Sequence, residues 1–166
     1  QPLSQAEVIK SIGEGALMLS EADRAAIFTI DENREIVLSW QRGFSEGYPE
    51  QAVKHGEEML AGVLPHGTEP VLIPDLDVFP SESLLRQQGM KEGWRGIEVW
   101  PLVYKGDPVA AIACYFDQPR FSSDAEQEVM QAFTRQAAVA LVNARLFEEA
   151  RRRTVQLESL NAIITA

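Results

Sequence analysis

WRGIEVWPLVYKGDPVAAIACYF, residues 94–116, carries the clearest structural signal in the chain. Two strongly apolar runs, 96–104 and 109–116, flank the turn-forming residues Lys105, Gly106 and Asp107. A strand with one face in water would alternate apolar and polar residues, so runs this apolar are expected to be covered on both faces. The stretch therefore predicts a β-hairpin in an antiparallel sheet that is covered on both faces.

The residues on the N-terminal side add further strands. The runs 25–30 and 36–40 surround the polar turn residues 31–33 and predict a second hairpin. Residues 71–73 predict a short strand that Pro74 and Asp75 end, and residues 82–92 favour a helix. The stretch 43–70 is punctuated by glycine and proline, and a short helix over 49–64 is expected within it. Hairpins with flanking helices indicate an α+β fold.

Two capping boxes predict the helices at the two ends of the chain. Ser4 with Glu7 opens a helix that should end near Glu21, and glycines 13 and 15 within it indicate close packing. Ser123 with Glu126 opens a helical pattern that runs to residue 166 without Gly or Pro. At 1.5 Å per residue this helix would extend about 65 Å. A compact domain of this size is only about 35–40 Å across, so the last turns must leave the domain or break.

The second half of the last helix has the spacing of a coiled coil. A 3-4 apolar repeat there predicts a parallel coiled coil with a second copy of the chain, most clearly after Leu146. An ordinary amphipathic helix packed on its own domain is the alternative. The repeat comprises Val139, Leu146, Ala150, Leu157, Leu160 and Ile164, with Asn143 and Arg153 as polar interruptions.

Charge and cysteine content narrow the function classes. The formal net charge of the 166 residues is −10, which argues against a nucleic-acid partner because phosphate binding needs a basic face. The scattered acidic residues indicate a solvated surface. One cysteine, Cys114, allows no internal disulfide and suits the reducing cytoplasm. No apolar run approaches the ~20 residues of a membrane span, so no membrane contact is expected of this stretch.

The order of these elements resembles the GAF family of sensory domains. The segments ADRAAIFTID (22–31), PVLIPDL (70–76) and RQAAVALVNARLFEEA (135–150) each look like a GAF counterpart. The hairpin of residues 94–116 resembles the family's paired strands, although Gly96 stands where Ser is usual and Ala111 where Gly is usual. The resemblance covers nearly the whole chain up to about Ala150. It is carried by order and spacing together, since no single segment is decisive.

The resemblance implies a GAF-like (profilin-like) α+β fold. An antiparallel sheet of five or six strands would carry the first and last helices on one face and a small-molecule pocket on the other. Residues 1–150 would form the GAF domain, and 151–166 would begin a linker helix to a downstream signalling domain, as in two-component systems. The terminal helices would form a parallel homodimer. A PAS-like sensor and a ligand-free dimerisation module are the alternatives.

Seven residues are candidates for the ligand pocket. Glu98 and Trp100 share one strand face, and a carboxylate in an apolar strand is expensive to bury unless it is paired. Glu98 could hold a donor on the ligand; alternatively it lies at an exposed sheet end or pairs with Arg95 or Lys105, with the tryptophans in the core. Asp75 could equally cap or turn the chain. The full set is Phe28, Asp75, Phe79, Trp94, Glu98, Trp100 and Tyr115.

Catalysis, cofactors and metals find no support in the sequence. Residues 60–100 contain no cysteine for a bilin, and the N-K-x-n-F motif of cyclic-nucleotide-binding relatives is absent. The GAF-type enzymes that reduce free methionine sulfoxide use several loop cysteines, whereas Cys114 lies in a predicted strand as an inert thiol. His55 and His66 have no second histidine or cysteine near them in the sequence and are expected in surface loops. We therefore expect a non-enzymatic sensor whose ligand the sequence does not name.

Overall fold

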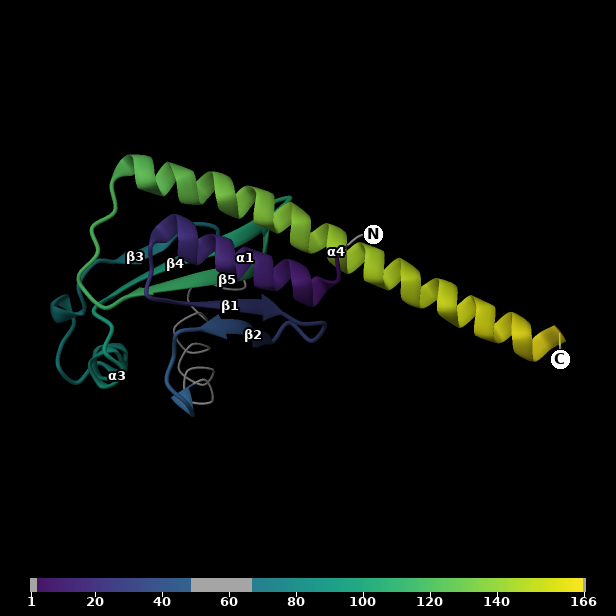
Figure 1. The fold of residues 1–166 in the computed structure, drawn as a ribbon, viewed down its shortest axis with the longest axis horizontal. Coiled ribbons are helices and arrows are strands. Elements are labelled where there is room, and N and C mark those ends of the chain that lie inside the picture. The colour runs from purple at the N-terminus through teal and green to yellow at the C-terminus, as the bar shows by residue number, and fades with distance from the viewer. Residues whose placement is uncertain (1–2, 49–66, 166) are drawn as a thin grey trace.

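The computed structural model describes residues 3–48 and 67–165, and its centre is a five-stranded antiparallel sheet (Figure 1). The strand order is β2-β1-β5-β4-β3, and every neighbouring pair is antiparallel. This confirms the predicted α+β class. The helix expected over 49–64, with His55 and His66, lies outside the described residues. The strands are β1 (Arg24–Ile30), β2 (Ile36–Arg42), β3 (Val71–Ile73), β4 (Gly96–Tyr104) and β5 (Asp107–Phe116).

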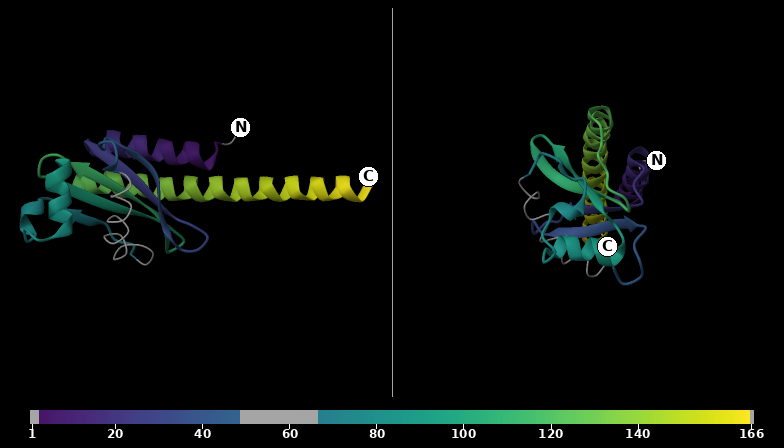
Figure 2. Two further views of the ribbon diagram at one scale, coloured as in Figure 1. Left: turned by 90° about the horizontal axis from the view of Figure 1, so that it is seen from below. Right: turned by 90° about the vertical axis from the view of Figure 1, so that its left-hand side faces the viewer.

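The helices α1 (Gln5–Ser20) and α4 (Asp124–Thr165) lie side by side on one face of the sheet, as predicted (Figures 1 and 2). Both predicted capping boxes are present at their N-termini. The backbone N–H of Gln5 also donates to the Glu148 carboxylate at 2.8 Å, which ties the start of α1 to the middle of α4. The 3-10 helix η1 (Leu76–Val78) and the helix α3 (Leu84–Glu92) follow β3. Helix α3 begins two residues later than predicted because Ser83 is its N-cap.

The central hairpin is the most deeply buried part of the sheet. Strands β4 and β5 pair from Gly96 opposite Phe116 to Tyr104 opposite Asp107, and the first seven residues of β4 are all buried. Lys105 and Gly106 form the turn with positive φ angles of 50° and 85°. Both faces of the hairpin are therefore covered, as its apolar sequence predicts.

Alternation of side chains along the strands divides the core into two layers. On the helix side, Ile27, Leu102 and Ile112 pack against residues of α1 and α4 such as Ala16 and Leu141. On the opposite side, which we call the far face, a second apolar cluster forms. Its buried members are Ala26, Phe28, Leu76, Trp94, Ile97, Val99, Ala111, Ala113 and Tyr115.

Two glycines bring α1 close to its neighbours. A Cβ atom added at Gly13 would lie 2.3 Å from the ring of Trp40 in β2, and one at Gly15 would lie 2.9 Å from Phe133 in α4. These distances are shorter than any van der Waals contact, so only glycine permits the observed approach. The close packing predicted from the sequence is confirmed.

Gly13→Ala should destabilise the domain, although Gly→Ala at an exposed helix position stabilises by about 1 kcal/mol. The added methyl group collides with the Trp40 ring, and overpacking of this kind costs about 1–3 kcal/mol. Urea denaturation measures the difference, with the exposed Ser11→Ala on the same helix as control. A Gly13→Ala variant as stable as the unaltered protein would contradict the described contact.

Helix α4 continues well beyond the sheet (Figures 1 and 2). Every residue from Glu149 to Thr165 is exposed, so this part of the helix packs on nothing within its own domain. The prediction that the last turns leave the domain is confirmed. Within residues 3–48 and 67–165, no helix is both long and apolar enough to span a bilayer.

Candidate functional site

The far face carries a cluster of four aromatic side chains from three parts of the chain. We call Phe44, Tyr48, Trp94 and Tyr115 the aromatic cluster. The Phe44 ring stacks on Tyr48 with centroids 5.0 Å apart and meets Tyr115 edge-on at 4.9 Å. Trp94 also meets Tyr115 edge-on, at 5.0 Å. Tyr48, Trp94 and Tyr115 are buried, so the rings form one compact apolar group beside the ends of β4 and β5.

Small residues occupy the middle of the far face next to this cluster. Ala26 of β1 pairs with Ala113 of β5, and Phe28 pairs with Ala111. The three alanine side chains are short, so they extend less far from the sheet than the neighbouring side chains of Phe28 and Tyr115. Ala26, Ala111 and Ala113 are only 0–3% exposed, so this strip of small residues is covered within the folded domain.

Four of the seven predicted pocket residues gather on or beside this face. Phe28, Trp94 and Tyr115 belong to the far-face cluster, and the half-buried Phe79 packs against it. The register of β1 thus puts Phe28 on the predicted side. Binding of a ligand by these residues stays a prediction.

Glu98 and Trp100 lie on the opposite side of the sheet, and their predicted place on a far-face pocket wall is wrong. Trp100 packs in the helix-side cluster, and its Nε1–H donates to Glu98 Oε1 at 3.2 Å. The two share a strand face as predicted, but α1 and α4 cover that face. The alternative for Glu98 is wrong as well, since Glu98 is 4% exposed and its hydrogen-bond partner is Trp100 rather than Arg95 or Lys105. The other part of that alternative is right, because Trp94 and Trp100 both lie in the core.

Asp75 is engaged in structural contacts. Its Oδ1 accepts the backbone N–H of Asp77 at 3.0 Å, which caps η1, and lies 3.3 Å from Arg95 Nη2. Arg95 also donates to Asp77 at 2.6 Å, and Arg86 donates to the carbonyl of Phe79 at 2.6 Å. These bonds fasten the loop after β3 to β4 and α3. Of the two roles that the sequence analysis considered for Asp75, the structure shows the capping role.

The sequence analysis missed Phe44, Tyr48 and the residue that anchors them. The buried carboxylate of Glu92 accepts bonds from the N–H of Ser45 at 2.7 Å and from its hydroxyl at 2.8 Å. Arg24 donates to the Glu92 carbonyl at 2.8 Å, which links the same point to β1. The segment 44–48 is thereby held over Trp94 and Tyr115. The sequence pointed to this anchored segment only through two aromatic residues in a stretch rich in glycine.

The two tyrosines of the cluster are uncharged hydrogen-bonding groups at neutral pH. Burial raises the pKa of Tyr115, and burial together with the nearby Glu92 carboxylate raises the pKa of Tyr48. Each phenol therefore keeps its proton and can donate to an acceptor on a ligand.

Cys114 should be unreactive in the folded protein. It lies on the helix side, fully buried, and burial raises its pKa to about 12, so almost no thiolate exists near neutral pH. We expect no labelling by a disulfide reagent at pH 8 and complete labelling in denaturant. Because the folded pKa is raised from 9.0, the stability that this thiol contributes is complete below about pH 9 and is lost as the pH rises toward 12. Fast labelling of the native protein would contradict the described burial.

A metal centre finds no support in the part of the chain that the structure describes. No group of three or more His, Cys, Asp or Glu side chains there is arranged to hold a metal ion. The predictions that the chain binds no metal or cofactor and catalyses no reaction remain predictions.

The fold and its two-sided sheet place the chain in a known family. The model of the GAF domain family matches residues 6–141, which is most of the chain. The chain therefore belongs to the GAF domain family, whose members serve as sensory and regulatory domains of signalling proteins. This match decides against the PAS-like alternative. No curated protein matches the sequence.

Solved structures agree with this assignment at the level of the fold. One is a domain described as belonging to a two-component sensor histidine kinase from Sinorhizobium meliloti 1021, with a TM-score of 0.69 and 23% identity over 88% of this chain and 96% of that one. Another, the GAF3 domain of Slr1393 from Synechocystis sp. PCC6803, has a TM-score of 0.68 and 11% identity over 88% and 98%. A GAF domain/HD domain protein from Geobacter sulfurreducens has a TM-score of 0.65 and 17% identity over 87% and 97%.

Proposed function

We propose that this chain is the ligand-sensing GAF domain of a larger cytoplasmic signalling protein. A small molecule binds on the far face beside the aromatic cluster, and the signal leaves through α4 to a downstream domain. The domain itself catalyses no reaction and contacts neither nucleic acid nor membrane. Residues 1–150 form the sensor, and 151–166 begin the linker helix.

The observation that carries this proposal is that the two faces of the sheet pack against different parts of the chain. The helix side is filled by α1 and α4, while the far face holds the three alanines and the aromatic cluster and is not covered by either helix. Strand β5 contributes alternate residues to both layers, with Tyr115 on one side and Cys114 on the other. A ligand that shifts β5 from the far face would therefore press directly on the helix layer.

The exposed face of α4 supports a homodimer as the output element. All eight positions of the predicted 3-4 repeat, from Val139 to Ile164, are exposed, and the five large apolar side chains among them are 46–70% exposed. The same spacing continues toward the N-terminus of α4 along residues that are exposed as well. These are Ala125, Val129, Ala132 and Gln136. We call this stripe from Ala125 to Ile164 the α4 seam.

The α4 seam and α1 together suit a parallel pair of chains. A helix segment with no contacts in its own domain is marginal in water, so the part after Glu149 needs a partner. A second copy supplies an identical apolar stripe, which meets the first in a coiled coil. On α1, the apolar side chains of Met18 and Leu19 are also exposed.

A ligand-free dimerisation module is the second candidate. The observation that favours it is the contact between the rings of the aromatic cluster, which already fill part of the far face. In that case the seam would be the only functional surface.

Native mass spectrometry of freshly purified protein, followed by a thermal-shift screen of metabolites, separates the two candidates. We expect a bound mass or a stabilising compound, because a ligand of the native state raises stability by RT ln(1 + [L]/Kd). Trp94→Phe should weaken binding of that compound about tenfold by removing the indole N–H, since one hydrogen bond contributes about 1 kcal/mol or more.

The matched control is Trp40→Phe, the same exchange on the helix side of the sheet. It should leave the affinity unchanged. A screen without any stabilising compound, for a protein that still dimerises, would favour the ligand-free module and contradict the sensor.

A further inference from the structure

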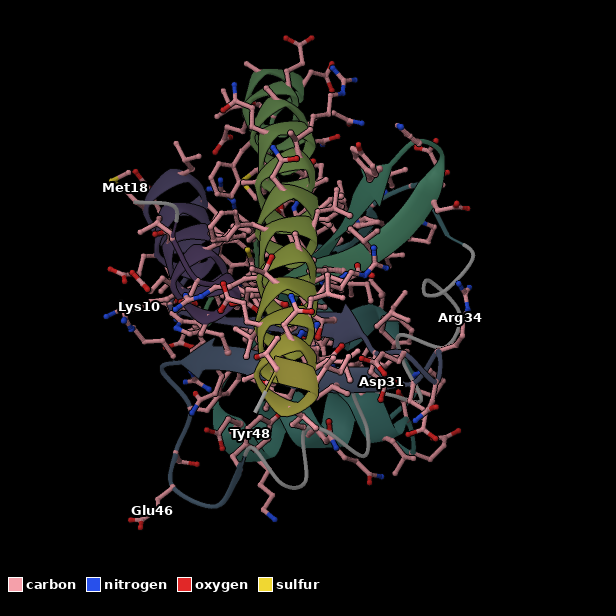
Figure 3. All side chains as sticks on the ribbon, turned by 90° about the vertical axis from the view of Figure 1, so that its right-hand side faces the viewer. Lys10, Met18, Asp31, Arg34, Glu46 and Tyr48 are labelled. Carbon is pink, nitrogen blue, oxygen red and sulfur yellow. The ribbon has the colours of Figure 1, made fainter. Side chains whose placement is uncertain are left out.

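A separate polar cleft lies at the opposite end of β1 from the aromatic cluster. It has a volume of about 560 Å³ and sits between the start of α1, the β1–β2 turn and the middle of α4. Figure 3 looks along α4 from its C-terminal end and shows Asp31 of that turn to one side of the helix. The lining residues are Gln5, Thr29, Ile30, Asp31, Glu32, Asn33, Val37, Arg145, Glu149 and Arg152.

The two walls of this cleft carry opposite charge. The α4 wall presents Arg145 and Arg152, while the turn presents Asp31 and Glu32. The remaining carboxylate, Glu149, lies on α4 itself and pairs with Arg153 outside the cleft at 2.8 Å. The cleft is thus an electric dipole, with cations on the helix and anions on the hairpin.

Most of these charges lack a partner in the described part of the chain. No ion pair or hydrogen bond within it engages the side chains of Arg145, Arg152 or Glu32. Arg145 is half-buried, and this burial lowers the pKa of its guanidinium group. No carboxylate in the described part of the chain pairs with it to offset the loss of hydration. Asp31 Oδ1 accepts the N–H groups of Asn33 and Glu35 at 2.8 and 2.9 Å, which holds the acidic turn in shape.

We propose that this cleft binds a small zwitterion of the amino-acid class. Its carboxylate pairs with Arg145 and Arg152, and its ammonium group faces Asp31 and Glu32. A plain anion would be repelled by the acidic turn, and a plain cation by the arginines. An apolar ligand would find only Ile30 and Val37, whereas a group with both charges satisfies both walls at once. The volume lies in the range of ~300–1,000 Å³ that is common for small-molecule sites.

The position of the cleft connects it to the output helix. Arg145 and Arg152 line the side of α4 that faces the hairpin, and no residue of the α4 seam lines the cleft. The ligand would bridge the hairpin and the part of α4 that leaves the domain. This site is independent of the ligand proposed for the far face.

Binding is tested with a series of ω-amino acids of increasing charge separation. The probes are glycine, 4-aminobutyrate and 5-aminopentanoate, with butyrate and butylamine as single-charge controls. Thermal shift and calorimetry should detect at least one amino acid, with each single-charge compound at least about tenfold weaker because it loses one ion-paired hydrogen bond. Two results would overturn the proposal: butyrate binds as tightly as the amino acids, or no amino acid binds at concentrations up to about 20 mM.

Two variants locate the binding site. Arg145→Gln should weaken the bound amino acid at least about tenfold, and Glu32→Gln on the exposed turn should do so without touching the core. Arg135→Gln, an exposed arginine of α4 outside the cleft, is the matched control and should bind as the unaltered protein does. Unchanged affinity in both Arg145→Gln and Glu32→Gln would place any binding elsewhere and overturn the proposal.

Discussion

Leu157→Asp is expected to weaken dimerisation of the chain at least a hundredfold. Leu157 is a 62% exposed residue of the α4 seam, and the proposed coiled coil buries it once in each copy. Burying a leucine contributes about 1.5–3 kcal/mol, so two copies contribute about 3–6 kcal/mol, and 1.4 kcal/mol is a factor of ten. Sedimentation equilibrium at micromolar concentration measures the dissociation constant.

The matched control for this prediction is Val155→Asp. Val155 is an equally apolar and 55% exposed residue of the same helix, but it lies outside the 3-4 repeat of the seam. Its replacement should leave the dimer intact. A strict monomer, or a dimer that Val155→Asp disrupts more than Leu157→Asp does, would show that the α4 seam is not the interface.

Arg153→Leu should act in the opposite direction on the same equilibrium. Arg153 occupies a core-type position of the seam, where it is 73% exposed at the side chain and pairs with Glu149. A charged residue there lowers coiled-coil stability, so leucine should tighten the dimer by about tenfold. A more stable seam should also make the paired helices harder for a ligand to rearrange. The ligand response of the full-length parent should then be smaller, because a ligand shifts the equilibrium only by its differential affinity.

Trp100→Ala should be among the most destabilising single substitutions in the domain, at about 3–5 kcal/mol. The side chain is 2% exposed in the helix-side core, so its removal leaves a large cavity. It also removes the N–H that donates to the buried Glu98 carboxylate. Chemical denaturation monitored by fluorescence of the remaining tryptophans gives the loss.

The conservative exchange Trp100→Phe separates the cavity from the lost hydrogen bond. It should cost about 1–3 kcal/mol, because a buried carboxylate without its donor bears its full desolvation penalty. Adding Glu98→Leu should recover most of that loss, since no buried polar group is then left without its hydrogen-bond donor. Trp40→Phe, on a half-buried tryptophan, is the control and should cost less. If Glu98→Leu destabilised the Trp100→Phe protein further, the described pair would not account for the burial of Glu98.

Local pattern was enough for most of the elements. The capping boxes at Ser4 and Ser123, the turn at Lys105–Gly106 and the apolar runs around it depend on neighbours within a few residues. Such signals act the same way in any fold. For this reason the boundaries of α1, β4 and α4 agree with the prediction to within a residue.

The candidate site could be predicted only in part. The sequence analysis named three residues of this face, because few large aromatic side chains lie in or beside the apolar strands. They are Phe28, Trp94 and Tyr115. Phe44 and Tyr48 were missed because Glu92, far along the chain, holds their segment in place through Ser45. The opposed charges of the polar cleft come from α4 and the β1–β2 turn, and only the packed fold brings them together.

The residue pattern was enough to predict the strands, the long final helix, the family resemblance and the shared strand face of Glu98 and Trp100. Which side of the sheet these two residues occupy became known from the packing of α1 and α4. Side-chain alternation has a period of two, so it groups residues into two sets but does not say which set meets the helices. That choice is made when α1 and α4, drawn close by Gly13 and Gly15, cover one side of the sheet and leave the other to Trp94 and Tyr115.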